Sequence, residues 1–228
     1  MTRIPPLPDP AILRQAAGDF RFLLDRGYPR QAGLVLVGNR YGLDRSARQM
    51  LHRGVFAADK ARERRAKLRL LTEAGGEPLA VDGHNVLITL ECAFRGLPVI
   101  VGDDGFIRDV AQISRAFRVN RDTERVLELL AYYLKEHHVS RVTVLYDAPM
   151  SKSGDLARRT REVFEEVGLA GEARAVPVPE QELLTFPGLV ATSDTHLIDA
   201  REIIVDVAGE IIRRERAQGN FIQIIELA

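Results

Sequence analysis

The spacing of apolar residues changes about a third of the way along the chain. Up to residue 73, apolar side chains recur every three or four positions, as in residues 10–26, and this spacing places them on one face of a helix. After residue 76, short apolar and β-branched runs alternate with stretches of helical periodicity. The pattern therefore predicts two regions of different structure, separated by the helix-breaking pair Gly75 and Gly76.

The first region is predicted to be all helical. We expect helices over residues 10–26, 30–37 and 58–73, and another that begins at residues 43–46. The helix over residues 58–73 bears six cations, Lys60, Arg62, Arg64, Arg65, Lys67 and Arg69. A charge run of this kind forms either a solvated helix face or a surface for phosphates. On the second interpretation, Arg62, Arg65 and Arg69 are candidate contacts for a nucleic-acid backbone.

The second region alternates strands with helices, which predicts an α/β fold with right-handed crossovers and a mostly parallel sheet covered on both faces. The predicted strands are 77–81, 98–101, 142–146, 173–176 and 189–192. The predicted helices are 85–94, 107–117, 123–137, 155–167, 180–184 and 207–217. We therefore expect a small all-α domain over residues 1–74 and an α/β domain over residues 75–228.

The net charge of zero hides an uneven distribution. Residues 1–72 carry 15 Lys and Arg against 6 Asp and Glu, and the rest of the chain carries 17 against 26. Such a split indicates either that the helical domain meets a polyanion, for which the expected partner is RNA, or that it pairs with the acidic α/β domain. That pairing would occur within one chain or in a homodimer.

Composition and motifs exclude several classes of protein. A single cysteine, Cys92, allows no internal disulfide, so we expect a reducing compartment. No apolar run approaches the roughly 18 residues of a membrane span, so we expect a soluble, cytoplasmic protein without a membrane partner. The sequence also lacks the P-loop, G-x-G-x-x-G and G-x-S-x-G motifs of NTPases, dinucleotide enzymes and serine hydrolases.

Three aspartates, Asp82, Asp147 and Asp194, follow three predicted strands. Because ligands bind at the carboxyl ends of parallel strands, these acids are expected to converge at one edge of the sheet. Neighbouring carboxylates repel one another unless a cation neutralises them, and oxygen ligands favour Mg²⁺ or Mn²⁺. The alternative is structural, since Asp is also a common turn residue and helix N-cap.

Polar neighbours of these acids are candidate substrate contacts. Asn85 can cap a helix or contact a phosphate, and Gly83 would permit close approach of a ligand. Hydroxyl groups, a lysine and a helix N-terminus coincide after Asp147, which suits a phosphate. The further candidates are Ser151, Lys152, Ser153, Ser193 and Thr195.

The sequence leaves a fourth acid open. Glu91 lies among apolar residues, so it is either at the margin of its helix or facing a site as an auxiliary catalytic acid. Asp103 and Asp104 belong either to a tight turn or to the metal site, with Asp104 the preferred ligand. Asp199 is a further candidate, and the adjacent Arg108 and Asp109 are a candidate ion pair.

Three short motifs resemble, in order and strand context, the acidic motifs of PIN-like and NYN-type nuclease domains. They are Asp82-Gly83-His84-Asn85, Tyr146-Asp147-Ala148-Pro149 and Thr192-Ser193-Asp194-Thr195. The resemblance implies a Rossmann-like sheet and RNA cleavage with Mg²⁺ or Mn²⁺ held by Asp82, Asp147 and Asp194. Nearly the whole chain also resembles an uncharacterised prokaryotic family that joins a small helical domain of unknown function to a PIN-like domain, and residues 41–53 and 81–109 carry that likeness.

The leading hypothesis is therefore a metal-dependent, ribonuclease-like enzyme that hydrolyses phosphodiesters at a cluster of carboxylates. One alternative is a non-catalytic nucleic-acid-binding or regulatory protein on a degenerate PIN-like scaffold. The other is a metal-dependent phosphatase or nucleotide hydrolase.

Overall fold

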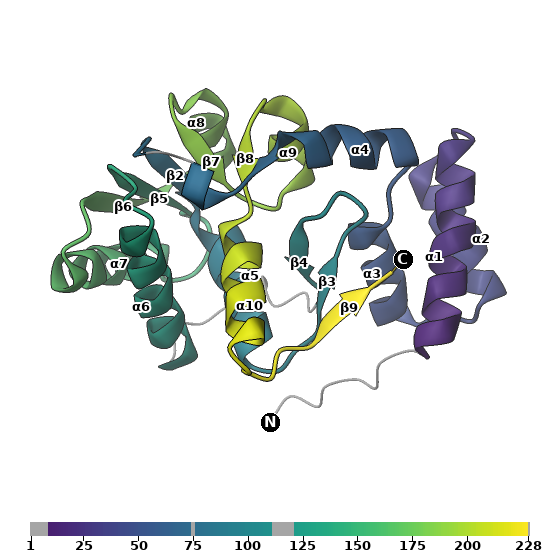
Figure 1. The fold of residues 1–228 in the computed structure, drawn as a ribbon. Helices are drawn as coiled ribbons and strands as arrows, with labels where there is room; N and C mark the ends of the chain where they lie inside the picture. The colour runs from purple at the N-terminus through teal and green to yellow at the C-terminus, as the bar shows by residue number, and fades with distance from the viewer. Residues whose placement is uncertain (1–8, 74–75, 111–120, 228) are drawn as a thin grey trace.

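A computed structural model describes residues 9–73, 76–110 and 121–227 and places a helical region, residues 9–67, beside an α/β region (Figure 1). The helices of the first region are α1 (Pro10–Asp25), α2 (Arg30–Arg40), α3 (Arg45–Gly54) and α4 (Ala58–Lys67). Leu13, Ala17 and Phe20 of α1 are buried, as their spacing predicts. The Asp44 carboxylate accepts the Ala47 N–H at 2.8 Å and caps α3. The all-helical prediction is confirmed for residues 10–67.

The basic helix α4 is shorter than predicted. It ends at Lys67, and the chain continues as strand β1 (Leu68–Arg69) and a 3-10 turn, η1 (Leu71–Glu73). Strand β1 pairs in parallel with β8 (Ile204–Val205), so main-chain hydrogen bonding in the sheet replaces a further helical turn. Arg69 therefore lies on a strand and not on the basic helix. The predicted boundary at residues 74–75 lies outside the described residues.

Six parallel strands form the main sheet, in the order β1-β8-β7-β2-β5-β6. The strands not yet given are β2 (Leu79–Asp82), β5 (Val142–Asp147), β6 (Gly171–Val176) and β7 (Leu189–Ala191). Strand β2 lies between β7 and β5, with Leu79 opposite both Leu189 and Val142. The predicted parallel sheet is confirmed, and the strand β8 that the sequence did not reveal belongs to it.

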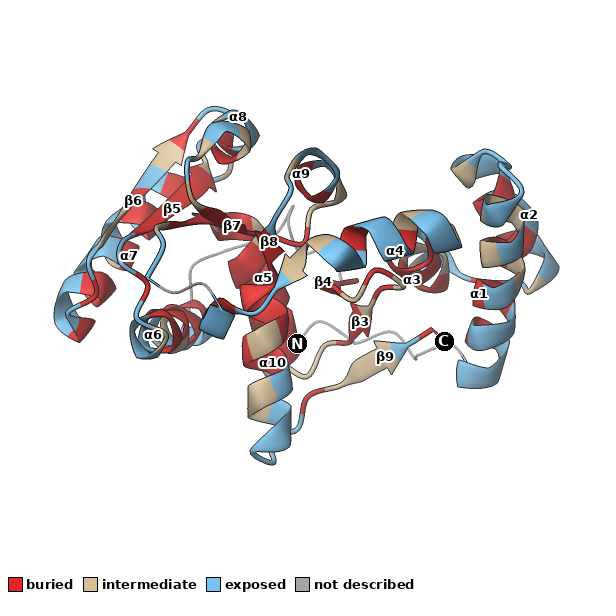
Figure 2. Ribbon diagram, turned by 45° about the horizontal axis from the view of Figure 1, so that its top comes forward, coloured by how far each residue is buried: buried red, intermediate tan, exposed pale blue. Residues whose placement is uncertain are grey.

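Helices cover both faces of this sheet (Figures 1 and 2). One face carries α5 (Gly83–Phe94), α6 (Arg121–Glu136), α7 (Ser153–Val167) and α10 (Val207–Ala217), and the other carries the shorter α8 (Pro179–Thr185) and α9 (Thr195–Ala200). Alternate residues of β2 serve the two cores, since Val81 packs with the first set of helices and Ala80 with the second. Helix α5 is buried along almost its whole length.

A second, smaller sheet has the order β4-β3-β9. Its strands are β3 (Val99–Val101), β4 (Ile107–Asp109) and β9 (Ile224–Glu226). Strand β3 is therefore not part of the main sheet, and the helix predicted over residues 107–117 is wrong for 107–109, because they pair antiparallel with β3. Gly105, at φ +87°, closes the turn between them. Val110 is not helical either, and the remaining residues of that prediction, 111–117, lie outside the described residues.

The small sheet joins the two regions. Ile100 of β3 and Leu227, next to β9, pack into the core of the helical region, whereas Val99 packs into the core of the main sheet. Gly54 at the end of α3 makes this approach possible, because a Cβ there would lie 2.7 Å from Leu227 Cδ1 and 2.9 Å from Ile100 Cδ1. Among the residues described, no helix combines the length and the apolar character that a membrane crossing requires.

Candidate functional site

Asp82, Asp147 and Asp194 stand at the carboxyl ends of three neighbouring parallel strands. Asp82 is the last residue of β2, Asp147 the last of β5, and Asp194 follows β7 by three residues. Because β2 lies between the other two strands, Asp82 occupies the middle of the row. The predicted convergence on one edge of the sheet is thus present in the topology.

Hydrogen bonds tie Asp82 to the loop that carries Asp194. Thr192 Oγ1 donates to Asp82 Oδ2 at 2.9 Å, and the Asp194 N–H donates to Thr192 Oγ1 at 3.1 Å. Asn85 reinforces the link, since its Oδ1 accepts both the N–H and the hydroxyl of Ser193, at 2.8 and 3.1 Å. Asn85 and Ser193, both predicted substrate contacts, therefore bind each other and fix the end of β7 against the start of α5.

The carboxyl of Asp82 is in an unusual electrostatic position. Burial at the packed sheet edge, with a smaller contribution from the charge of Asp194, raises its pKa to about 7, although the hydrogen bond from Thr192 acts in the opposite direction. Near pH 7 both the protonated and the ionised form of the Asp82 carboxyl group are therefore populated. A cation would favour the ionised form and displace the proton.

Asp194 and Asp147 also have structural roles. Asp194 Oδ1 accepts the N–H groups of His196 and Leu197, so this residue is the N-cap of α9, as the structural alternative proposed. The Asp147 N–H donates to His84 Nδ1 at 3.1 Å, which fixes the neutral ring with its hydrogen on Nε2. Burial lowers the pKa of His84 to about 4, so the ring stays neutral. Within the described residues, no three Asp, Glu, His or Cys side chains form a group that could hold a metal ion.

The structure does not bring the candidate fourth acids to this row. Glu91 lies nine residues along α5 from Asp82, about 13 Å at the helical rise, and is paired with Arg95 at 3.1 Å and Thr123 at 3.2 Å. Asp104 is fully buried and receives two 2.8 Å hydrogen bonds from Arg108.

Other acids near the hairpin turn are also engaged by arginines. Asp103 receives two hydrogen bonds from Arg21, and Asp199 receives two from Arg64. The predicted pair of Arg108 with Asp109 is wrong, because the fold pairs Arg108 with Asp104 and leaves Asp109 to Arg53, at 3.2 Å. The tight-turn interpretation of residues 102–105 is confirmed.

Of the substrate contacts predicted after Asp147, one is buried in the protein and two are exposed. Ser153 is buried, and its hydroxyl lies 2.6 Å from the carbonyl oxygens of Asp147 and Met150. Ser151 and Lys152 are exposed before α7, and Lys152 has a left-handed backbone, φ +65°. Gly83 does not open space for a ligand, because a Cβ there would lie 2.4 Å from the ring of Tyr146.

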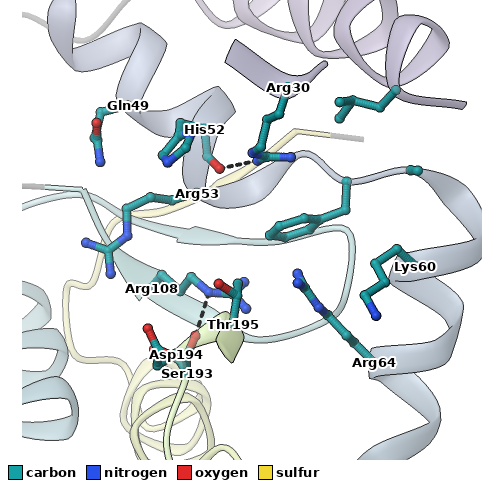
Figure 3. Close-up of a pocket in the computed structure, with 13 residues that line it drawn as sticks. Arg30, Gln49, His52, Arg53, Lys60, Arg64, Arg108, Ser193, Asp194 and Thr195 are labelled. Carbon is teal, nitrogen blue, oxygen red and sulfur yellow. Dashed lines mark hydrogen bonds between the residues drawn. The ribbon is translucent and has the colours of Figure 1, made fainter. Parts of the chain in front are cut away.

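A pocket of about 530 Å³ lies beside Asp194, between the helical region and the end of β7 (Figure 3). It is lined by Leu24, Arg30, Gln49, His52, Arg53, Phe56, Ala57, Lys60, Arg64, Arg108, Ser193, Asp194 and Thr195. Five of these side chains are cationic, and Asp194 is the one carboxylate among them. We call this cavity the arginine pocket.

The three arginines predicted to contact nucleic acid do not line the arginine pocket. Arg62 and Arg65 border a second cavity on another face of α4, where Arg62 pairs with Asp59 at 2.7 Å. Arg69 donates to main-chain carbonyl oxygens at the end of α4.

Sequence reasoning named Lys60 and Arg64 as members of the basic helix, but it did not single out the other three cations that line the pocket. Arg30, Arg53 and Arg108 lie far apart in the chain and converge through tertiary folding. The excess of positive charge in residues 1–72 was the available signal for Arg30 and Arg53, but not for Arg108.

Ion pairs also join the two regions of the chain. Arg21 binds Asp103 at 2.7 Å, and Arg64 binds Asp199 at 2.7 Å and Asp104 at 3.5 Å. Each pair sets a cation of the basic helical region against an acid of the α/β region. Part of the charge asymmetry is therefore satisfied within one chain.

Comparison with known proteins places both regions in families. Residues 12–67 match "Protein of unknown function (DUF434)", and residues 71–210 match "Domain of unknown function (DUF5616)". "Uncharacterized protein MJ0935" of Methanocaldococcus jannaschii is 31% identical over 202 residues, which cover 88% of this chain and 96% of the relative. No solved structure matches. The chain therefore belongs to the DUF5616 family, with a DUF434 region before that domain.

Proposed function

We propose that this protein is a metal-dependent phosphodiester hydrolase of the PIN-like, ribonuclease type. The observation that carries the proposal is the position of Asp194, which is linked to Asp82 through Thr192 and also lines the arginine pocket. Carboxylates that can hold a cation thus adjoin a cavity whose charge suits a phosphate. These are the two parts that phosphodiester hydrolysis needs side by side.

The donor set at the sheet edge fits a hard cation. Mg²⁺ is commonly held by one or two carboxylates, with water and substrate phosphate oxygens completing its shell, so a group of three protein ligands is not required. One or two of Asp82, Asp147 and Asp194 would hold it directly, and the raised pKa of Asp82 supports this role. When bound, Mg²⁺ or Mn²⁺ would polarise the phosphodiester and lower the pKa of a water molecule.

The remaining residues have defined tasks in this scheme. Asn85 and Thr192 hold the acids in register through their hydrogen bonds, and His84 fixes the main chain at Asp147. Glu91 and Asp104 are left out of the active site, because arginine side chains already engage their carboxylates. Arg30 and Lys60 of the arginine pocket would hold the negatively charged substrate.

A second candidate is the hydrolysis of small phosphate esters or nucleotides. The arginine pocket favours it, because about 530 Å³ is the size of a typical small-ligand cavity. The two candidates share the acids and differ in substrate length, so the same preparations test both.

The test measures cleavage of end-labelled single-stranded RNA, and of nucleoside monophosphates, with Mg²⁺ or Mn²⁺. We expect Asp82→Asn and Asp194→Asn to reduce turnover by roughly 100-fold, about 2.7 kcal/mol in the barrier. Glu165→Gln on the exposed face of α7 is the matched control and should cleave like the wild type. Isothermal titration with Mn²⁺ gives an independent reading, since binding should weaken in the two Asp variants alone.

Cleavage of RNA supports the ribonuclease, and turnover of mononucleotides without RNA cleavage supports the second candidate. The hydrolase proposal is overturned if folded wild-type protein turns over neither substrate with either metal. It is also overturned if turnover is the same in Asp82→Asn as in Glu165→Gln.

A further inference from the structure

We propose that the arginine pocket is a binding site for a phosphate group, with Arg30 as its anchoring cation and Lys60 at its mouth. The inference names the ligand class of the proposed hydrolase site, and rests on that function for its biological role but not for the binding itself. The inference follows from a comparison of the pocket's arginines, which differ in whether a carboxylate of the protein already neutralises them.

Arg30 differs from the other arginines of the pocket in its partners. Its guanidinium donates to the carbonyl oxygens of Val55, at 2.8 Å, and His52. It also lies 5.3 Å and 4.9 Å from the ring centres of Phe20 and Phe56. In the described part of the chain, the hydrogen bonds and ion pairs of Arg30 include no carboxylate. Withdrawing a cation from water without a counter-ion costs free energy that a bound anion would recover.

Two further guanidinium groups surround the same aromatic ring. Arg64 lies 4.5 Å and Arg108 5.3 Å from the centre of Phe56, whose side chain is buried. Burial, together with repulsion from Arg64 and Arg108, lowers the pKa of Arg30 to about 10. Three guanidinium groups thus lie around one ring, and the attraction of Asp103 and Asp104 does not offset the burial and repulsion that Arg30 experiences there.

Among the described residues, the nearby carboxylates accept hydrogen bonds from Arg64 and Arg108 and none from Arg30. Asp104 accepts two 2.8 Å hydrogen bonds from Arg108, and Asp199 accepts hydrogen bonds of 2.7 and 2.8 Å from Arg64. These paired contacts use the forked geometry of each arginine and hold both groups rigid. Ligand neutralisation is therefore left mainly to Arg30. Lys60, whose side chain is 40% exposed, pairs with Glu63 at 3.1 Å and with Asp199 at 3.2 Å, and it would contact a ligand by exchanging these solvent-exposed pairs.

The shape and charge of the pocket favour phosphate over a carboxylate. Phosphate presents several oxygens and up to two negative charges, which suits convergent cations better than a flat monoanion does. The cavity also leaves room for the group that the phosphate is attached to. Ser193 and Thr195 line the pocket beside Asp194 (Figure 3), and the Thr195 hydroxyl is the candidate contact for that attached group.

The test is calorimetric titration of the full chain in EDTA, so that hydrolysis cannot contribute. The probes are inorganic phosphate, pyrophosphate, adenosine monophosphate, and a short single-stranded RNA with or without a 5′-phosphate. We expect Arg30→Gln to weaken binding about tenfold, as loss of a charged hydrogen-bond donor does. Arg62→Gln is the matched control, because Arg62 is exposed on the same helix as Lys60 and lies outside the pocket.

Lys60→Gln keeps the proposal testable if Arg30→Gln fails to fold. Lys60 is partly exposed on α4, so its loss should leave the melting temperature nearly unchanged while weakening binding severalfold. Circular dichroism of each variant separates loss of the fold from loss of the site.

Each result assigns a source for the phosphate or overturns the site. Tighter binding of the 5′-phosphorylated RNA indicates a terminal phosphate, equal binding of both RNAs indicates the backbone, and binding of the small probes alone indicates a free nucleotide or phosphate. The proposal is overturned if no probe binds, or if Lys60→Gln and a folded Arg30→Gln bind as tightly as Arg62→Gln. Phosphate binding without turnover would overturn the proposed hydrolase function, but it would support the arginine pocket as a phosphate-binding site.

Discussion

Thr192 donates its hydroxyl hydrogen to the carboxylate of Asp82 over 2.9 Å, and this contact joins strand β7 to strand β2 at the candidate site. The same hydroxyl oxygen accepts the main-chain N–H of Asp194 at 3.1 Å. One buried side chain therefore sets the spacing of two acids on neighbouring strands.

Replacing Thr192 by Val should destabilise the fold and disturb the site together. The Asp194 N–H loses its acceptor and the Asp82 carboxylate loses a donor, so we expect a loss of about 1–3 kcal/mol at pH 8. Urea denaturation measures it. Thr192→Ser retains the hydroxyl and should lose much less, so equal losses in the two variants would show that the hydrogen bonds are unimportant.

Asp82 should make the protein less stable as the pH rises. Its pKa is about 7 in the folded chain and near 3.8 when exposed, so ionisation above pH 4 is penalised only in the folded state. The penalty is on the order of 4 kcal/mol at most when fully developed above pH 7. The stability difference between Asp82→Asn and wild type should therefore grow in favour of the variant between pH 5 and pH 8.

Asp59→Asn, a change at an exposed acid, is the control for that experiment. Its stability should run parallel to that of the wild type across the same pH range. A difference between Asp82→Asn and wild type that stays constant with pH would show that Asp82 ionises normally.

His84 should remain neutral throughout the physiological range. Burial lowers its pKa to about 4, and its Nδ1 accepts the Asp147 N–H. The folded state resists a proton that the unfolded chain accepts below about pH 6.5, so His84 lowers stability as the pH falls from there toward 4. Nuclear magnetic resonance should show a flat His84 Cε1–H shift from pH 5 to 8, with the signal identified by its absence in His84→Gln. A titration midpoint near 6.5 would contradict the burial argument.

Removing Arg108 should be among the most damaging single changes. It would leave Asp104, which is fully buried, without its two-point partner, and we expect a loss of about 3–5 kcal/mol. Arg62→Met, at an exposed pair, should cost well under 1 kcal/mol in the same denaturation experiment. The double variant Asp104→Leu with Arg108→Met should recover part of the loss, and a double variant worse than Arg108→Met would refute this account.

The main sheet was predictable because each of its central strands carries its own signal. The runs that end at Asp82, Asp147 and Asp194 are apolar, short and bounded by turn residues, so their shared edge follows from parallel topology alone. The PIN-like assignment remains a proposal, because it depends on the chemistry of that edge as well as on the strand order.

The elements that escaped prediction depend on distant partners. Ile107 forms a strand only because β3 is there to pair with it, and β9 pairs with β3 from more than 120 residues away. The arginine pocket also depends on long-range contacts. Arg30 and Arg108 come together around Phe56, and no local sequence pattern predicts this. Local periodicity cannot report contacts of this kind.

The packing of Leu227 against Gly54 bears on the order in which the chain acquires its structure. Helices α1 to α3 leave the ribosome early, but their core includes Ile100 and Leu227. Closing that core must await the synthesis of residues 224–227, and such long-range contacts form slowly. During translation the helical region would therefore expose apolar surface for most of the time that the rest of the chain takes to emerge.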